Sequence, residues 1–93
     1  MAERKAHLHH PKDNVAVALD NLERGDVVVV EKGGSKTRVE IREAVPFGHK
    51  FALEAIERGG EVTKYGAFIG RATRDIAVGE HVHVHNIKSE KYT

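Results

Sequence analysis

Apolar residues recur around four glycines in one pattern, apolar-x-x-Gly-x-x-apolar. Its copies are centred on Gly25, Gly48, Gly59 and Gly79. In three of them an alanine stands four residues before the first apolar position, as in "ALDNLERG", "ALEAIERG" and "ATRDIAVG". Because the copies are unequally spaced, the pattern indicates a turn used repeatedly within one domain, in which an apolar side chain anchors the turn and glycine adopts a positive φ.

The segments after these turns have the composition and alternation of β-strands. "DVVVV" is a run of valines, "KTRVEIR" places Val39 and Ile41 on one face, and "HVHVHNI" alternates valine with histidine. Gly33-Gly34 between the first two predicts a tight hairpin turn. "NVAVAL" also alternates. "KFALEAIERG" has a helical composition, but it repeats "ALDNLERG" and is therefore interpreted as extended. The sequence predicts a mostly β domain of short strands joined by glycine turns.

Composition narrows the function classes. The chain has 93 residues, no cysteine, and 15 basic against 14 acidic residues mixed along its length. Thiol chemistry is excluded, and neither a basic patch nor an aromatic platform favours nucleic acid. With no apolar run for a signal peptide or a membrane span, we expect a cytoplasmic protein without a membrane partner. So short a chain has little room for a deep active site, and a second polypeptide is expected to complete one.

Three histidines alternate in "GEHVHVHN", residues 79–86. In a strand His81, His83 and His85 would share one face, while Val82 and Val84 would point into the core. Imidazoles at alternate strand positions suit one metal ion or one anion, and a third ligand from elsewhere would strengthen a metal site. The alternative is the solvent face of a histidine-rich edge strand.

Other polar motifs have a weaker chemical signal. In "HLHHPKDN" the histidines are followed by Asp13 and Asn14, which are interpreted mainly as turn caps. His49 and Lys50 follow a glycine turn, where they suit either anion binding or plain solvation. Tyr65, in "KYGAFIG", is interpreted as a half-buried packing residue next to a close backbone approach at the glycines.

These motifs, in this order, resemble the small SAF-type (β-clip) domain of the altronate and galactarate dehydratases and of the related sulfolactate sulfo-lyase small subunit. The resemblance rests on "HPKDNVAVAL", "VPFGHKFAL", "KYG", "IG-x-AT-x-DI" and "GEHVHVHN". It runs from about residue 10 to about residue 88 of a single domain, 1–93, and leaves 1–9 and 89–93 as terminal extensions. It implies the SAF-type β-clip fold.

The resemblance also implies a function: a lyase that removes water, or sulfite in the sulfo-lyase relative, from an acidic polyol by β-elimination with Fe²⁺ or Mn²⁺. Because the sequence ends at Thr93, we expect the small subunit of a sugar-acid dehydratase, inactive alone and completed by a large catalytic subunit. The alternatives are the sulfo-lyase small subunit and a non-catalytic substrate-binding or assembly module. Exposed strand edges also leave a homo-oligomer open.

Site residues follow from the matching motifs. The resemblance implies catalytic roles for His83, His85 and His49 and suggests His83 and His85 as metal ligands, but it leaves open which histidines bind the metal and which bind substrate or act as the acid. It implies substrate binding by Lys50, Asn86 and His10. His81 precedes the motif and is interpreted as a solvated neighbour, while His7 and His9 fall outside the matched segment.

Overall fold

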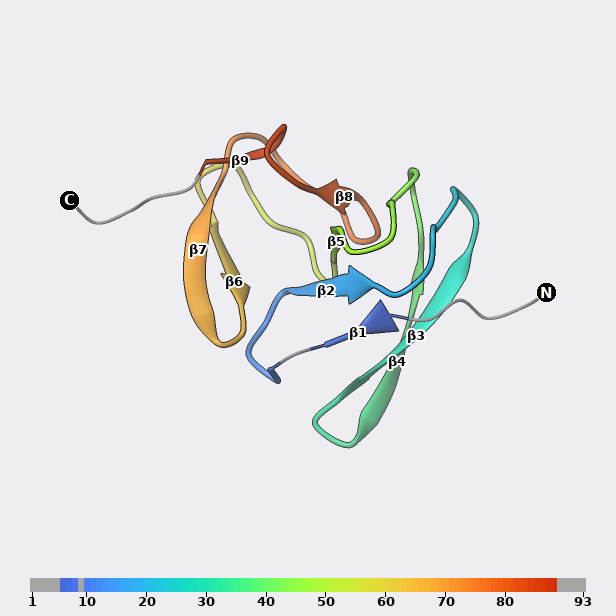
Figure 1. The fold of residues 1–93 in the computed structure, drawn as a ribbon. Coiled ribbons are helices and arrows are strands. Elements are labelled where there is room, and N and C mark those ends of the chain that lie inside the picture. Colours follow the sequence, from blue (N-terminus) through green and yellow to red (C-terminus); the bar gives the residue numbers. More distant parts are fainter. Residues whose placement is uncertain (1–5, 9, 89–93) are drawn as a thin grey trace.

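The computed structural model describes residues 6–8 and 10–88, and this part of the chain consists of strands and turns without a helix (Figure 1). It therefore contains no helix long and apolar enough to cross a membrane. The prediction of a mostly β domain is confirmed. The strands are β1 (Ala6–His7), β2 (Val15–Ala18), β3 (Val27–Lys32), β4 (Ser35–Glu40), β5 (Lys50–Ala52), β6 (Glu61–Lys64), β7 (Ala67–Ala72), β8 (His81–Val82) and β9 (Ile87–Lys88).

The strands form three small antiparallel sheets. One has the order β1-β2-β5-β8, the second is the β3–β4 hairpin, and the third has the order β6-β7-β9. The β3–β4 hairpin turns through Gly33 and Gly34, with φ of 59° and 85° and the pair Lys32–Ser35 closing the turn. The predicted two-residue hairpin turn is confirmed, because such turns need positive φ at both positions.

The four glycine turns associate in two pairs, and each pair is joined at its apolar anchors. Leu22 and Val45 exchange two backbone hydrogen bonds of 2.9 Å, and Ile56 and Ile76 exchange two of 2.8 and 2.7 Å. The predicted repeat is confirmed. In each pair the glycine N–H donates to a carbonyl in the partner turn: Gly25 to Ile41, Gly48 to Ala18, Gly59 to Ala72 and Gly79 to Ala52.

These pairings also explain the turn that lacks an alanine. Ile41 occupies, four residues before Val45, the place that an alanine has in the other three copies. The segment "KFALEAIERG" forms β5 and then one of these turns, so its extended interpretation is confirmed. Its pairing partner holds it extended although its residues favour a helix.

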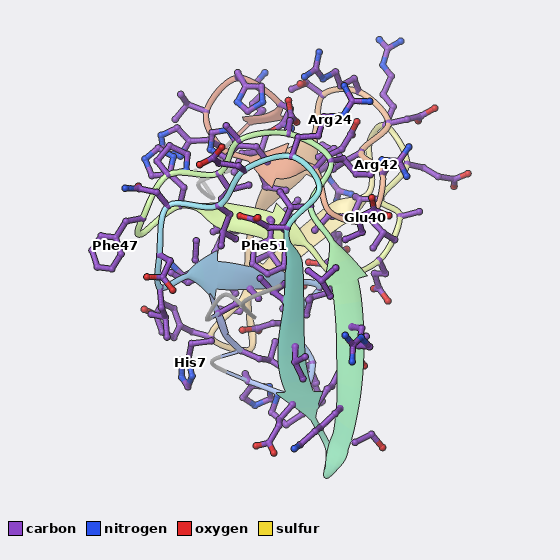
Figure 2. All side chains as sticks on the ribbon, turned by 90° about the vertical axis from the view of Figure 1, so that its right-hand side faces the viewer. His7, Arg24, Glu40, Arg42, Phe47 and Phe51 are labelled. Carbon is purple, nitrogen blue, oxygen red and sulfur yellow. The ribbon has the colours of Figure 1, made fainter. Side chains whose placement is uncertain are left out.

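Buried side chains form two clusters on either side of the β2–β5 pair. Phe51 belongs to the first, which packs against the β3–β4 hairpin, and Val82 belongs to the second, which packs against β6 and β7. In Figure 2 the Phe51 ring lies inside the ribbon near β2, while the Phe47 ring projects away from the ribbon.

The C-terminal part of the fold differs from the prediction. β8 covers only His81 and Val82, and residues 83–86 form a turn before β9. Val84 is consequently 80% exposed, and its expected place in the core is wrong.

Candidate functional site

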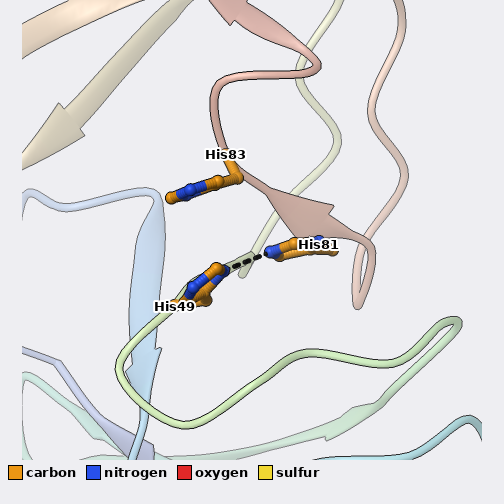
Figure 3. A group of neighbouring side chains, drawn as sticks. All are labelled: His49, His81 and His83. Atoms are coloured by element: carbon orange, nitrogen blue, oxygen red, sulfur yellow. Dashed lines mark hydrogen bonds between the residues drawn. The ribbon is translucent and has the colours of Figure 1, made fainter.

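A histidine group forms where β5 and β8 pair. The antiparallel register sets Lys50 against Val82 and Phe51 against His81, so the next step along β5 brings His49 opposite His83. The two rings stack with centroids 4.1 Å apart and planes 24° apart. His81 completes the group, with His49 Nδ1 and His81 Nε2 2.9 Å apart in a hydrogen bond (Figure 3).

Asn86 shapes the turn that carries these histidines. Its side chain is fully buried, its Oδ1 accepts from the His83 N–H at 2.9 Å, and its Nδ2 donates to the His81 carbonyl at 2.7 Å. The N–H groups of Asn86 and Ile87 both donate to the His83 carbonyl, which closes the turn. The Asn86 amide therefore holds the backbone of His81 and His83, and this internal bonding is why the expected strand ends at Val82.

The three imidazoles fit a transition-metal ion. One nitrogen each from His49, His81 and His83 lies within 4.8 Å of the other two. Metal–imidazole bonds of about 2.0–2.1 Å hold neighbouring nitrogens roughly 3 Å apart, close to the 2.9 Å between His49 and His81. An all-imidazole set suits iron or zinc better than manganese, which prefers oxygen ligands.

The protonation of the group also suits a metal. Burial, together with the positive potential of His85, His49 and His83, lowers the pKa of His81 from 6.5 to about 4, against an opposing contribution from Glu43. Partial burial, followed by the neighbouring His49 and Lys50, also lowers the pKa of His83. Metals bind the neutral imidazole, and a lowered pKa keeps these rings neutral at pH 7.

The interpretation of His81 as a solvated neighbour is wrong. The residue is half-buried, its backbone N–H donates to the Glu43 carboxylate at 3.1 Å, and its imidazole hydrogen-bonds to that of His49. His85 is exposed, with its ring centroid 5.0 Å from that of His81, and lies outside the three-nitrogen group. Because the chain turns after Val82, the imidazole nitrogens that converge in the described residues are those of His49, His81 and His83.

Lys50, next to His49 in the chain, and Lys64, at the end of β6, add positive charge to this part of the domain. Lys50, beside His49, is half-buried, and burial followed by the charge of Lys64 lowers its pKa. Lys50 acts in turn on His83. No motif assigns Lys64 a role in the site, although "KYG", which contains it, is part of the resemblance.

Asp13 and Asn14 fasten the segment before β2 to the β6–β7 hairpin. The Asp13 carboxylate accepts from the N–H groups of Tyr65 and Gly66 at 2.9 and 2.7 Å. The Asn14 Oδ1 accepts from Thr63 N–H at 2.9 Å, and its Nδ2 donates to the carbonyl of Glu61 at 2.8 Å. Asp13 thus caps a turn, but one that lies 52 residues further along the chain.

His10 lies at the same hairpin. Its Nδ1 accepts from the Lys12 N–H at 3.1 Å, and a Cβ placed on Gly66 would come within 3.0 Å of its ring. The predicted close approach at Gly66 is confirmed, whereas Tyr65 is 61% exposed and the half-buried interpretation of it is wrong. His7 is exposed on β1, and His9 lies outside the described residues.

The described part of the chain is a small β-clip domain built of short strands and paired glycine turns. Its three half-buried histidines form a candidate metal centre. Residues 5–90 match the family model described as the altronate/galactarate dehydratase SAF domain. The chain belongs to this SAF-domain family and is a domain related to dehydratases and other lyases.

Two kinds of relative differ in length. The chain is 49% identical over 80 residues to an altronate dehydratase of Escherichia coli and 38% identical to one of Bacillus subtilis, and it spans only 15% of the length of each. It is 34% identical over 88 residues to the (2R)-sulfolactate sulfo-lyase subunit alpha of Chromohalobacter salexigens, covering 91% of this chain and 94% of that one.

Proposed function

We propose that this chain is the SAF component of a hydro-lyase that dehydrates a sugar acid of the altronate or galactarate type. In this proposal His49, His81 and His83 bind a divalent metal, and a larger catalytic chain completes the site. The convergence of the three imidazole nitrogens within 4.8 Å supports it most directly. The 49% identity to an altronate dehydratase supports the choice of substrate.

The chemistry matches the groups at the site. Dehydration removes a proton α to a carboxylate and expels a hydroxyl from the neighbouring carbon, so it needs a base, an acid and charge stabilisation. When bound, Fe²⁺ supplies Lewis acidity toward substrate oxygens. His85, exposed beside His81 and outside the metal group, can move a proton at its imidazole. Lys50 offers its ammonium group to the substrate carboxylate.

The surroundings of the histidines favour a covering partner. Phe47, 64% exposed, lies two residues before His49, and Val84, 80% exposed, directly follows His83. Large apolar side chains exposed beside a polar site are typical of a surface that binds another protein. The partner would exclude water from a site that this small domain leaves open.

A second candidate is the alpha subunit of a sulfolactate sulfo-lyase. It is favoured by the relative from Chromohalobacter salexigens, which the chain matches over 94% of its length. The elimination is analogous, with sulfite in place of hydroxide as the leaving group, and the same residues would serve.

The test is reconstitution with the large lyase chain from the same organism, assayed with altronate, galactarate and (2R)-sulfolactate. We expect the isolated chain to be inactive and His83→Gln to lower kcat of the complex at least 100-fold. His7→Gln, on β1 outside the group, serves as the matched control. Unchanged kcat in His83→Gln with weakened subunit binding would assign the chain an assembly role instead.

A further inference from the structure

His81 is held by its backbone as well as by its ring. The order β1-β2-β5-β8 places β8 at the edge of its sheet, with β5 on one side only. The His81 N–H donates to Glu43 Oε2 at 3.1 Å, and the His81 carbonyl accepts from Asn86 Nδ2 at 2.7 Å. Two side chains therefore bond to His81 where an inner strand would have another strand beside it.

Glu43 belongs to the same glycine turn as His49. The apolar anchor of this turn is Val45, which is fully buried and exchanges two backbone hydrogen bonds of 2.9 Å with Leu22. The anchor fixes the turn on both sides of itself. One turn therefore contributes both the His49 imidazole and the carboxylate that holds His81.

The turn itself does not require a carboxylate at this position. Glu54 and Arg74 stand at the equivalent place, two residues before the apolar anchor, in the second pair of turns. Both are exposed, whereas Glu43 is half-buried. Arginine has no hydrogen-bond acceptor in its side chain, so the turn forms without one. The bond to His81 is what distinguishes Glu43 from these equivalents.

The bond between the rings cannot hold His81 in place while the same nitrogens bind a cation. It needs a proton between His49 Nδ1 and His81 Nε2, which are 2.9 Å apart. A nitrogen that ligates a metal ion gives its lone pair to the ion, and the shared proton is displaced. The position of His81 then depends on its backbone bonds to Glu43 and Asn86.

We propose that Glu43 is a positioning residue for the histidine group, and that its bond to the His81 N–H holds the His81 imidazole in place for a divalent cation bound with His49 and His83. The cation site itself rests on the proposed function. Glu43 is not among the three residues whose ligand atoms converge, so it acts through His81. A ligand that is already held in place loses less conformational freedom when the cation binds, and the cation binds more tightly.

The test measures the Zn²⁺ affinity of the full chain by isothermal titration calorimetry, well below the Tm of the least stable variant. Glu43→Gln retains a side-chain oxygen that can accept from the His81 N–H, so we expect Zn²⁺ affinity and Tm close to those of the unchanged protein. Glu43→Ala removes the acceptor. We expect it to lower Tm and to weaken Zn²⁺ binding about tenfold or more, the range for partners that hold metal ligands.

Asp75→Ala is the matched control for the loss of one such bond. The Asp75 carboxylate accepts from the Arg58 N–H at 2.9 Å, between two turns that carry none of the three histidines. This variant should lower Tm without changing the affinity for Zn²⁺. The comparison separates a loss of stability from a loss of metal binding.

The outcomes distinguish this inference from the proposed function. Equal Zn²⁺ affinity in Glu43→Ala and the unchanged chain overturns the positioning role and leaves the histidine site intact. Equal losses in Glu43→Gln and Glu43→Ala also overturn it, because the charge of Glu43 would then matter and not its bond to His81. Absence of Zn²⁺ binding by the unchanged chain overturns the metal role in the proposed function, and this inference with it.

Discussion

His49 and His83 lie opposite each other across the β5–β8 pair, with ring centroids 4.1 Å apart. They are 34 residues apart in the chain, and one comes from the end of a glycine turn while the other begins a turn held by Asn86. The candidate site is thus a cross-strand site. Its geometry depends on strand pairing and on the Asn86 turn, and the alternation of histidines in one strand is not what creates it.

The third nitrogen of the proposed metal group distinguishes His81 from His85. We expect His81→Gln to weaken Zn²⁺ or Fe²⁺ binding at least tenfold, because it removes one of three converging imidazoles. His85→Gln, whose ring lies 5.0 Å from that of His81 and outside the nitrogen group, should bind metal nearly as the unchanged protein does. Isothermal titration calorimetry of the full chain, anaerobic for Fe²⁺, measures both affinities. A larger loss in His85→Gln would contradict the assignment.

The lowered pKa of His81 predicts a pH dependence of stability. Its value falls from 6.5 to about 4 in the folded chain, so between these values the unfolded chain binds the proton more readily. The free energy of unfolding should therefore fall as the pH decreases from 6.5 toward 4, while above pH 6.5 the ring is neutral in both states and contributes nothing. Partial exposure of the ring reduces the size of this effect.

The measurement is urea unfolding at pH 7, 6 and 5 of the metal-free chain and of His81→Gln. The variant should lose less stability over this range. The pKa of His83 is lowered as well, so a smaller dependence in the same direction remains in the variant. Identical slopes for the two proteins would show that His81 is not protected from protonation by the fold.

Asn86 should contribute strongly to stability. Asn86→Ala removes two hydrogen bonds from a fully buried side chain and leaves the His83 N–H and the His81 carbonyl without them. We expect a loss of about 2–3 kcal/mol and a Tm lower by about 10 °C. Asn21→Ala, an exposed asparagine with one bond to the Phe47 N–H, is the matched control and should lose about 1 kcal/mol or less. Thermal unfolding followed by circular dichroism compares them, and similar losses would contradict the role of Asn86.

Much of the fold could be predicted from local patterns. Gly33-Gly34 and the repeated glycine turns carry their geometry in their own residues, because positive φ favours glycine. Local patterns do not, however, predict that β8 ends before Val84. Alternation favours a strand there, and only the burial of Asn86 and its bonds to His81 and His83 end it.

The site was predicted only in part, because its contacts are non-local. His49 and His83 could be named from motifs, but the stacking of one on the other requires the β5–β8 register, which no short pattern encodes. The motif that points to His83 begins after His81, so it does not indicate the role of His81 in the group. Asp13 could be recognised as a turn cap, but the turn that it caps belongs to Tyr65, on a hairpin far along the chain.

Two glycines in equivalent turns offer a test of the packing between the sheets. Gly59 and Gly79 have nearly equal φ values of 84° and 86°, so an alanine is strained to the same extent at both, by about 1–2 kcal/mol. Their surroundings differ. A Cβ on Gly59 meets nothing within 4 Å, whereas a Cβ on Gly79 would come within 2.0 Å of the Glu40 carbonyl oxygen.

The clash at Gly79 requires the turn before β8 to move away from the end of β4. That movement would also break the 2.9 Å bond from the Arg42 N–H to the Gly79 carbonyl. We expect Gly59→Ala to lose about 1–2 kcal/mol of unfolding free energy and Gly79→Ala to lose at least about 2 kcal/mol more, through the added overpacking. Urea unfolding of the two variants measures the difference, and metal binding by Gly79→Ala should also weaken because β8 carries His81. Equal stability of the two variants would mean that β4 does not fix the position of the histidine strand.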